Sequence, residues 1–288
     1  MRSQRYIKVE QKTPEDKFIE VNGLRLHYLD WGNYNKPTML LLHGACAHAH
    51  WWDFFAINFC MDYHIIALDQ RGHGDSEWSN PPAYKSLNYV GDIEEFIEKV
   101  GLKDIVLIGH SMGGHNSMVY GGISKANKLK SLVIVDSLAY VPGLEDEEFY
   151  RRLKDYPLPI YNTLEGAIER FRLAPEETFA SPEILRHIAH YSVKGLASGK
   201  WKLKFDKNAF LLWSPLDARD YIGNIQCPMI FVRGAKSSVV PRDKAEEIVR
   251  LCPRGKLVEI KRAYHHVFLD NPVEFEEAIR DSFGWVKG

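Results

Sequence analysis

The stretch Gly109-His110-Ser111-Met112-Gly113 decides the fold of this chain. A short apolar run at residues 104–108 precedes it and is typical of a buried strand, while the residues after 113 indicate the start of a helix. A serine with a glycine two residues away on each side, at a strand-to-helix corner, is the pattern of a nucleophile elbow. Side chains in place of Gly109 and Gly113 would collide with the neighbouring strand and helix. The pattern therefore predicts that Ser111 stands clear of the sheet and that the amide of Met112 points to the same space.

Composition describes an ordinary globular protein. The 288 residues are 45% hydrophobic and 26% charged, and the formal net charge is -1. This balance gives no electrostatic reason to expect nucleic acid or an anionic membrane as a partner. No apolar run approaches the ~20 residues that span a bilayer, and residues 1–10 contain no apolar segment of signal-peptide length. The four cysteines lack CxxC spacing, so we expect reduced thiols in a cytoplasmic protein.

Apolar runs alternate with helical patterns along most of the chain. Asn22-Gly23 between alternating segments predicts a hairpin of strands at 18–21 and 24–29. Further strands are predicted at 38–42, 63–68, 129–135, 228–232 and 256–260, and helices at 86–100, 242–251 and 272–283. Continuous apolar strands between helices predict an α/β fold with a mostly parallel sheet covered on both faces.

The alternation breaks between about residues 140 and 217. This stretch is rich in proline and predicts helices at 146–156, 163–173 and 182–193, with no strand that pairs with the main sheet. We therefore predict a core of residues 1–139 and 218–288, and a helical lid of residues 140–217 over the carboxyl edge of the sheet.

A serine hydroxyl needs a base to become a nucleophile, and a carboxylate to orient that base. In this architecture the chain order is serine, acid, histidine. The segment between the last predicted strand and the final helix holds two histidines, His265 and His266. Either could serve as the base, and we prefer His265.

Four motifs, in order, resemble those of the α/β-hydrolase superfamily over nearly the whole chain. They are His43-Gly44, the run Asp-Gln-Arg-Gly-His-Gly-Asp-Ser at 69–76, Gly-His-Ser-Met-Gly at 109–113, and His-Val-Phe-Leu-Asp-Asn-Pro at 266–272. The resemblance implies an eight-stranded, mostly parallel sheet with a lid inserted after the sixth strand. It also implies that the amides of Ala45 and Met112 bind an oxyanion. The motif points to His265 as the base, although Tyr264 stands where the family usually has glycine.

The position of the acid departs from the common family pattern. Many members carry it after the seventh strand, about three or four residues past a glycine, where this chain has Ser237 and Ser238. A second location in the family is the end of the sixth strand, and Asp136 ends that strand here. We predict Asp136 as the acid. The alternatives are Asp243 or another acid, or no acid at all, with Asp136 only capping the turn that leaves the strand.

Other histidines and aromatic residues lie near the predicted site. The loop that carries His43, His48 and His50 matches no regular zinc spacing, so we expect a polar pocket there and no metal. His48, Trp52 and His110 are candidates for contact with the substrate.

These features together predict a serine hydrolase that cleaves small-molecule carboxylic esters through an acyl-enzyme, with Ser111, His265 and Asp136 as the triad and no cofactor. Lipases, thioesterases and carbon–carbon bond hydrolases of this fold use the same catalytic residues and are alternative functions. Epoxide hydrolases and haloalkane dehalogenases of the fold use an aspartate nucleophile, which the serine at 111 argues against. A non-catalytic binding protein or receptor is the alternative of another class. The sequence does not indicate an oligomeric state.

Overall fold

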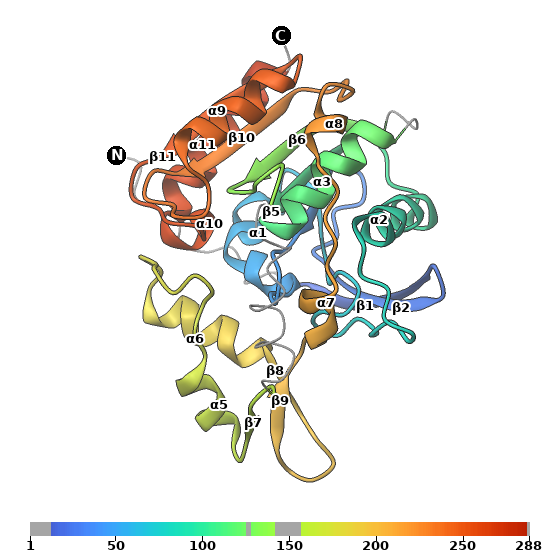
Figure 1. Ribbon diagram of the computed structural model, residues 1–288, viewed down its shortest axis with the longest axis vertical. Coiled ribbons are helices and arrows are strands. Elements are labelled where there is room, and N and C mark those ends of the chain that lie inside the picture. The colour runs from blue at the N-terminus through green and yellow to red at the C-terminus, as the bar shows by residue number, and fades with distance from the viewer. Residues whose placement is uncertain (1–12, 125–127, 142–156, 287–288) are drawn as a thin grey trace.

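An eight-stranded sheet forms the centre of the computed structural model, which describes residues 13–124, 128–141 and 157–286 (Figure 1). In spatial order its strands are β1 Glu15–Val21, β2 Leu24–Asp30, β4 His64–Leu68, β3 Thr38–Leu42, β5 Ile105–His110, β6 Leu129–Val135, β10 Met229–Gly234 and β11 Gly255–Ile260. The β1–β2 and β2–β4 pairs are antiparallel, and all other neighbours are parallel. The predicted mostly parallel sheet of eight strands is confirmed.

Helices cover both faces of this sheet, as predicted. On one face pack α2 Ser86–Val100, α3 Met112–Ile123, α8 Arg219–Ile222 and α9 Arg242–Leu251. On the other pack α1 Asp53–Phe59, α10 Val267–Asp270 and α11 Pro272–Val286, with the short helix η1 Ala49–Trp52 before α1. Successive residues of β3 supply the two cores in turn, since Leu40 and Leu42 face one and Met39 and Leu41 the other. This two-sided burial explains why the strand has no polar residue after Thr38.

The turn between β1 and β2 takes the form that its sequence predicts. Asn22 and Gly23 have φ values of 47° and 74°, which place both in the left-handed region. A two-residue hairpin turn of type I′ requires positive φ at both positions, and Asn-Gly adopts it most readily.

We call residues 140–217, the segment predicted as a lid, the insertion; it follows β6 and precedes β10, and the structure describes its residues 140–141 and 157–217. Figure 1 shows most of its elements grouped together below the main sheet, with α7 nearer to β1 and β2. Two of its predicted helices are present with tighter bounds, α5 Leu164–Arg170 and α6 Pro182–Tyr191, and α7 Lys207–Leu211 follows. The helix predicted at 146–156 falls outside the described residues.

A small sheet in the insertion was not predicted. It consists of β7 Ile160–Tyr161, β8 Val193–Gly195 and β9 Trp201–Leu203, in the antiparallel order β7-β9-β8. Each strand has only two or three residues, too few for the alternation of polar and apolar side chains to stand out. None of the three pairs with the main sheet.

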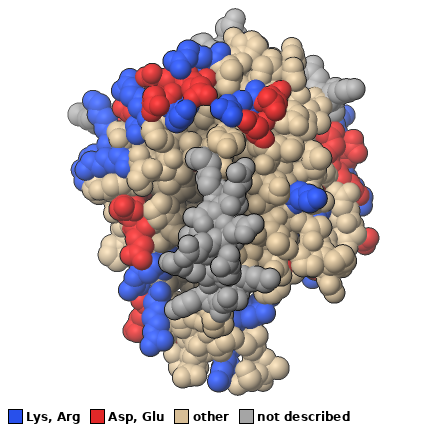
Figure 2. All heavy atoms as spheres, in the orientation of Figure 1, with Lys and Arg blue, Asp and Glu red and all other residues tan. Residues whose placement is uncertain are grey.

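Charges of both signs are interspersed on the face shown in Figure 2. Helix α9 carries two exposed ion pairs, Arg242 with Glu246 at 3.0 Å and Lys244 with Glu247 at 2.9 Å. Among the residues that the structure describes, no helix has the length and apolar character needed to cross a membrane.

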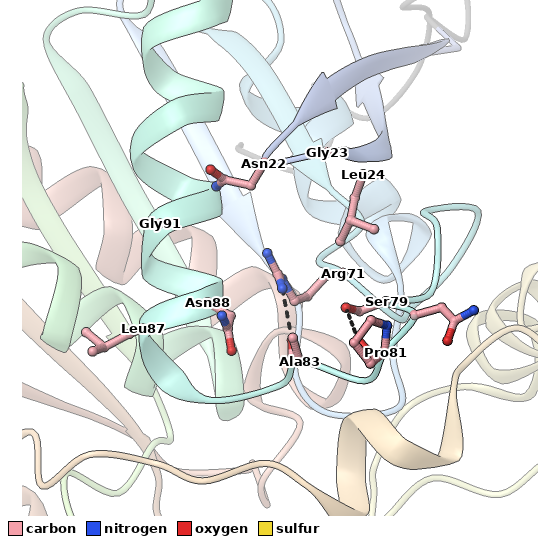
Figure 3. A pocket seen from close by; sticks show the side chains of 11 residues that line it. Asn22, Gly23, Leu24, Arg71, Ser79, Pro81, Ala83, Leu87, Asn88 and Gly91 are labelled. Carbon is pink, nitrogen blue, oxygen red and sulfur yellow. Dashed lines mark hydrogen bonds between the residues drawn. The ribbon is translucent and has the colours of Figure 1, made fainter.

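A buried ion pair fixes the turn that follows β4. The guanidinium of Arg71 donates from Nε and Nη2 to the two carboxylate oxygens of Asp92, each at 2.6 Å, and from Nη1 to the carbonyl of Ala83 at 2.9 Å. Asn22 donates to the same carboxylate at 3.0 Å. Figure 3 shows Arg71 and Asn22 beside a hollow of about 490 Å³. Because protein groups already hold the guanidinium, this arginine serves the structure of the turn.

The substitution Arg71→Gln is expected to lower the free energy of unfolding by about 3 kcal/mol, because it leaves the buried Asp92 carboxylate without its counter-ion. Urea denaturation measures the change. The matched control is Arg242→Gln, which removes an exposed arginine that pairs with Glu246 and Glu259, and should cost less than about 1 kcal/mol. Equal, small losses in the two variants would contradict this role of Arg71.

Candidate active site

Ser111 occupies a strained corner between β5 and α3. Its backbone has φ 51° and ψ −118°, a conformation that residues other than glycine seldom adopt. A Cβ at Gly109 would lie 2.4 Å from the carbonyl oxygen of Gly113, and one at Gly113 would lie 2.6 Å from the carbonyl oxygens of Leu42 and His43. Both glycines are therefore required sterically, for the reason that the sequence predicts.

The loop after β3 packs directly against this corner. A Cβ at Gly44 would come within 2.9 Å of Nδ1 of His110 and 3.2 Å of Cβ of Ser111, so the backbone that leads to Ala45 touches the elbow. Ala45 and Met112 also pack in one small apolar cluster. Met112 is the first residue of α3, where amides have no acceptor within the helix and the helix dipole favours negative charge. Two backbone segments suited to bind an oxyanion thus flank Ser111.

Asp136 and His265 form a buried hydrogen-bonded pair. Nδ1–H of His265 donates to Oδ2 of Asp136 at 2.7 Å, with the proton assigned to Nδ1 because an ionised carboxylate only accepts. The Asp136 side chain is 0% exposed and that of His265 is 5% exposed. This bond leaves Nε2 as the ring nitrogen that is able to accept a proton. The structure therefore joins the predicted acid with the preferred histidine.

Two further donors hold the Asp136 carboxylate. The hydroxyl of Ser237 donates to Oδ2 at 2.5 Å, and the amide of Gly234 donates to Oδ1 at 3.2 Å. Ser237 stands at the position after the seventh strand where the family pattern predicted an acid, and here it donates to the carboxylate at the end of the neighbouring strand β6. Sequence reasoning eliminated Ser237 as an acid but missed its role as a donor. The alternative acid, Asp243, lies exposed in the first turn of α9.

Two neutral histidines accompany His265. His266 donates from Nε2 to the carbonyl of Pro175 at 3.0 Å, and His110 donates from Nε2 to the carbonyl of His265 at 3.1 Å. Burial lowers the pKa of His266 to about 3 and holds the pKa of His110 well below its ordinary value. Both rings are therefore uncharged at neutral pH. His266 is engaged away from Asp136, which favours His265 of the two histidines.

Two residues predicted to contact the substrate, His48 and Trp52, are both buried but have different neighbours. His48 is buried, and its Nε2 donates to Oγ of Ser192 in the insertion at 2.9 Å. Trp52 is fully buried and stacks on Phe268 at 4.1 Å between ring centroids, so it belongs to the core beneath the site. The neighbouring Trp51 takes the place expected of Trp52, since it lines the cavity described next. Helical periodicity alone did not distinguish the two.

A cavity of about 250 Å³ lies between the core and the insertion. Its walls are mostly aromatic and aliphatic, with charged groups from two arginines. The lining residues are Ala45, Cys46 and Trp51 from the core, and Tyr161, Arg170, Phe171, Arg172, Leu173, Ala174, Ser192, Leu203 and Phe205 from the insertion. Ala45, whose amide is one of the two candidates for binding an oxyanion, is among these lining residues.

The family is shown by comparison with known proteins. A family model described as alpha/beta hydrolase fold matches residues 37–272. The chain belongs to the α/β-hydrolase fold family.

Named relatives differ in how much of the chain they match. The sn-1-specific diacylglycerol lipase ABHD11 of Mus musculus is 24% identical over 86% of this chain and 81% of its own length. The 3-hydroxybutyrate-oligomer hydrolase of Cupriavidus necator is 24% identical over 87% of this chain and 90% of its own. Epoxide hydrolase 4 of Mus musculus is 38% identical, but over only 33% of this chain and 27% of that protein. Among solved structures, E-2-(acetamidomethylene)succinate hydrolase superposes with a TM-score of 0.79 at 22% identity, covering 93% of this chain and 98% of that one.

Buried histidines should make the fold sensitive to mild acid. Burial lowers the pKa values of His48, His73 and His266 to about 3. In the unfolded chain the pKa of these rings is about 6.5. Between the folded and the unfolded pKa the unfolded state binds more protons, so the free energy of unfolding falls as the pH falls. His27 opposes the trend, because its bonds to Asp69 and Asp16 outweigh burial and raise its pKa.

We expect the free energy of unfolding, from urea titrations, to drop by several kcal/mol between pH 7 and pH 5, at about 1.4 kcal/mol per pH unit for each buried ring. The variant His266→Gln removes one of these groups and should show a shallower dependence. Stability that is constant or rises toward pH 5 would contradict this account of the histidines.

Proposed function

We propose that this protein is a serine hydrolase that cleaves carboxylic esters through an acyl-enzyme. The observation that carries the proposal is the buried 2.7 Å bond between His265 and Asp136, formed at the sheet edge where Ser111 is held in a strained conformation. A histidine with one nitrogen bound to a carboxylate and the other available is the arrangement that activates a serine.

Each residue has a defined step in the proposed reaction. Nε2 of His265 removes the hydroxyl proton as Oγ of Ser111 attacks the ester carbonyl. The amides of Ala45 and Met112 stabilise the oxyanion, and Asp136 orients the imidazole and stabilises its charged form. His265 then gives its proton to the leaving alcohol. In the second half it takes a proton from water, which attacks the acyl group and releases Ser111. No step uses a metal or an organic cofactor.

The insertion fits the proposed role of a lid that selects the substrate. It supplies most of the walls of the 250 Å³ cavity, and aromatic rings of both parts line that space. A cavity of this size and character suits an acyl group of small or medium length. Lipases and thioesterases use the same catalytic groups, so an ester as the bond that is cleaved is itself part of the proposal. The names of two relatives that match along most of their length, a diacylglycerol lipase and a hydroxybutyrate-oligomer hydrolase, support an ester.

The short match with epoxide hydrolases does not favour epoxide opening. A carboxylate that opens an epoxide forms an ester, which water then cleaves. A serine hydroxyl would form an ether at the same step, and an ether has no carbonyl for water to attack. Because residue 111 is serine, the chemistry of this elbow favours acyl transfer over epoxide hydrolysis.

A fluorophosphonate probe is expected to label the wild-type protein once, at Ser111, because only an activated serine attacks the phosphorus. Mass spectrometry of the digested protein locates the adduct. Ser111→Ala should abolish labelling, and the control Ser79→Ala, in the loop after β4, should leave it unchanged. A folded wild-type protein that resists the probe would favour the non-catalytic binding protein instead.

Asp136→Asn is expected to lower kcat by about 10⁴-fold, because the amide stabilises neither the required tautomer nor the imidazolium. Hydrolysis of p-nitrophenyl esters of graded acyl length provides the rates and also reports the preferred chain length. The exchange Asp136→Ser with Ser237→Asp keeps a carboxylate and a hydroxyl at the same site, and should recover at least about tenfold of the lost rate. A near-normal kcat in Asp136→Asn would show that another group orients His265.

A further inference from the structure

Three side chains with metal-ligating atoms meet where the insertion touches the core. Oδ2 of Asp53, the first residue of α1, accepts hydrogen bonds from Nδ1 of His50 at 2.9 Å and from Nε2 of His187 at 2.7 Å. His50 lies in η1, whereas His187 lies on α6 of the insertion, 134 residues from Asp53. One ligand atom from each of the three lies within 4.8 Å of those of the other two.

One atom of this cluster lacks a partner. Oδ1 of Asp53 is buried and accepts no hydrogen bond from any described residue. Both bonds from the histidines go to Oδ2, so half of the carboxylate's capacity to accept hydrogen bonds is unused. A buried acceptor without a partner costs free energy unless a further group binds there.

We propose that His50, Asp53 and His187 form a site for a transition-metal ion of the zinc type, which fastens the insertion to the core. Two imidazoles and one carboxylate are a common ligand set for such ions, with a remaining position for water. Calcium and magnesium prefer sets of oxygen ligands, so the two ring nitrogens argue against them. Oδ1 of Asp53 would accept a hydrogen bond from the metal-bound water or act as a second ligand.

The two distances to Oδ2 of Asp53 need little adjustment to accept the ion. Ligands at 2.0–2.2 Å from a tetrahedral zinc lie about 3.3 Å from one another, so each histidine has to withdraw from Oδ2 by only about 0.5 Å. Each ring must also move its proton to the other nitrogen, from Nδ1 to Nε2 in His50 and from Nε2 to Nδ1 in His187. The His187 side chain is 31% exposed, which leaves a route for the ion to enter.

Aromatic neighbours already hold the two imidazoles in place. Tyr191, also on α6, stacks on His50 with ring centroids 3.6 Å apart and planes 17° apart. Phe54 meets His187 edge to face at 5.0 Å. Rigid support of the ligands lowers the cost of ordering them when the ion binds. The site is thus formed before binding, and the ion would stabilise the insertion against the core.

The test is a titration of chelator-treated protein with Co²⁺, whose visible absorption reports nitrogen and oxygen coordination directly. We expect the protein to bind one Co²⁺ at this cluster, and His187→Gln and Asp53→Asn each to weaken that binding by more than about tenfold. The matched control is His190→Gln, an exposed histidine on the same helix, which should bind like the wild type. Zn²⁺ should raise the melting temperature of the wild type and of the control, but not of His187→Gln.

A second histidine cluster defines the competing outcome. His110, His265 and His266 also lie within 4.8 Å of one another by their ligand atoms. If His266→Gln abolishes the Co²⁺ spectrum while His187→Gln retains it, the ion binds at the other cluster and the proposal is wrong. It is equally wrong if wild-type protein gives no spectrum. The readout is spectral and thermal, so failure of the proposed esterase activity would not affect it.

Discussion

The parallel alignment of β5, β6 and β10 is the constraint on which the candidate site depends. Because these neighbouring strands run in the same direction, Ser111, Asp136 and Gly234 reach the same edge of the sheet. The first two both have positive φ, 51° and 45°, so the chain turns sharply as it leaves each strand. Backbone conformations of this kind cost about 1–3 kcal/mol each, and persist where the surrounding fold enforces them. Of the two side chains, that of Asp136 reaches His265, which follows β11.

Burial makes the Asp136 carboxylate costly, and its neighbours offset that cost. Donors from His265, Ser237 and Gly234 surround it, and its side chain is 0% exposed. In such surroundings an unpaired charge would be strongly unfavourable, whereas a fully bonded one holds its partners rigidly. Ser237 and Gly234 hold the carboxylate in place, and the carboxylate in turn fixes the orientation of the His265 imidazole. For orienting His265, the hydrogen bonds that the carboxylate receives matter more than the strand on which it lies.

Local patterns in the sequence predicted those parts of the structure that local physics determines. Apolar runs predicted the strands of the main sheet, Asn22-Gly23 predicted the hairpin, and the two glycines around Ser111 predicted the sharp turn at that residue. The proposal of Asp136 as the acid came from its place at the end of the sixth strand and from the serines that follow Gly234. The bond from Ser237 to Asp136 spans 101 residues, and that from His187 to Asp53 spans 134, so no periodicity encodes either. The choice of Trp51 over Trp52 as a cavity residue, and the strands of the insertion, likewise depend on tertiary packing.

A crystal structure of the protein inactivated by a fluorophosphonate tests the central claim most directly. The account predicts phosphorus bonded to Oγ of Ser111, the phosphonyl oxygen within hydrogen-bonding distance of the amides of Ala45 and Met112, and His265 still bound to Asp136. An adduct on another residue, a phosphonyl oxygen directed away from both amides, or a different carboxylate bound to His265 would contradict it.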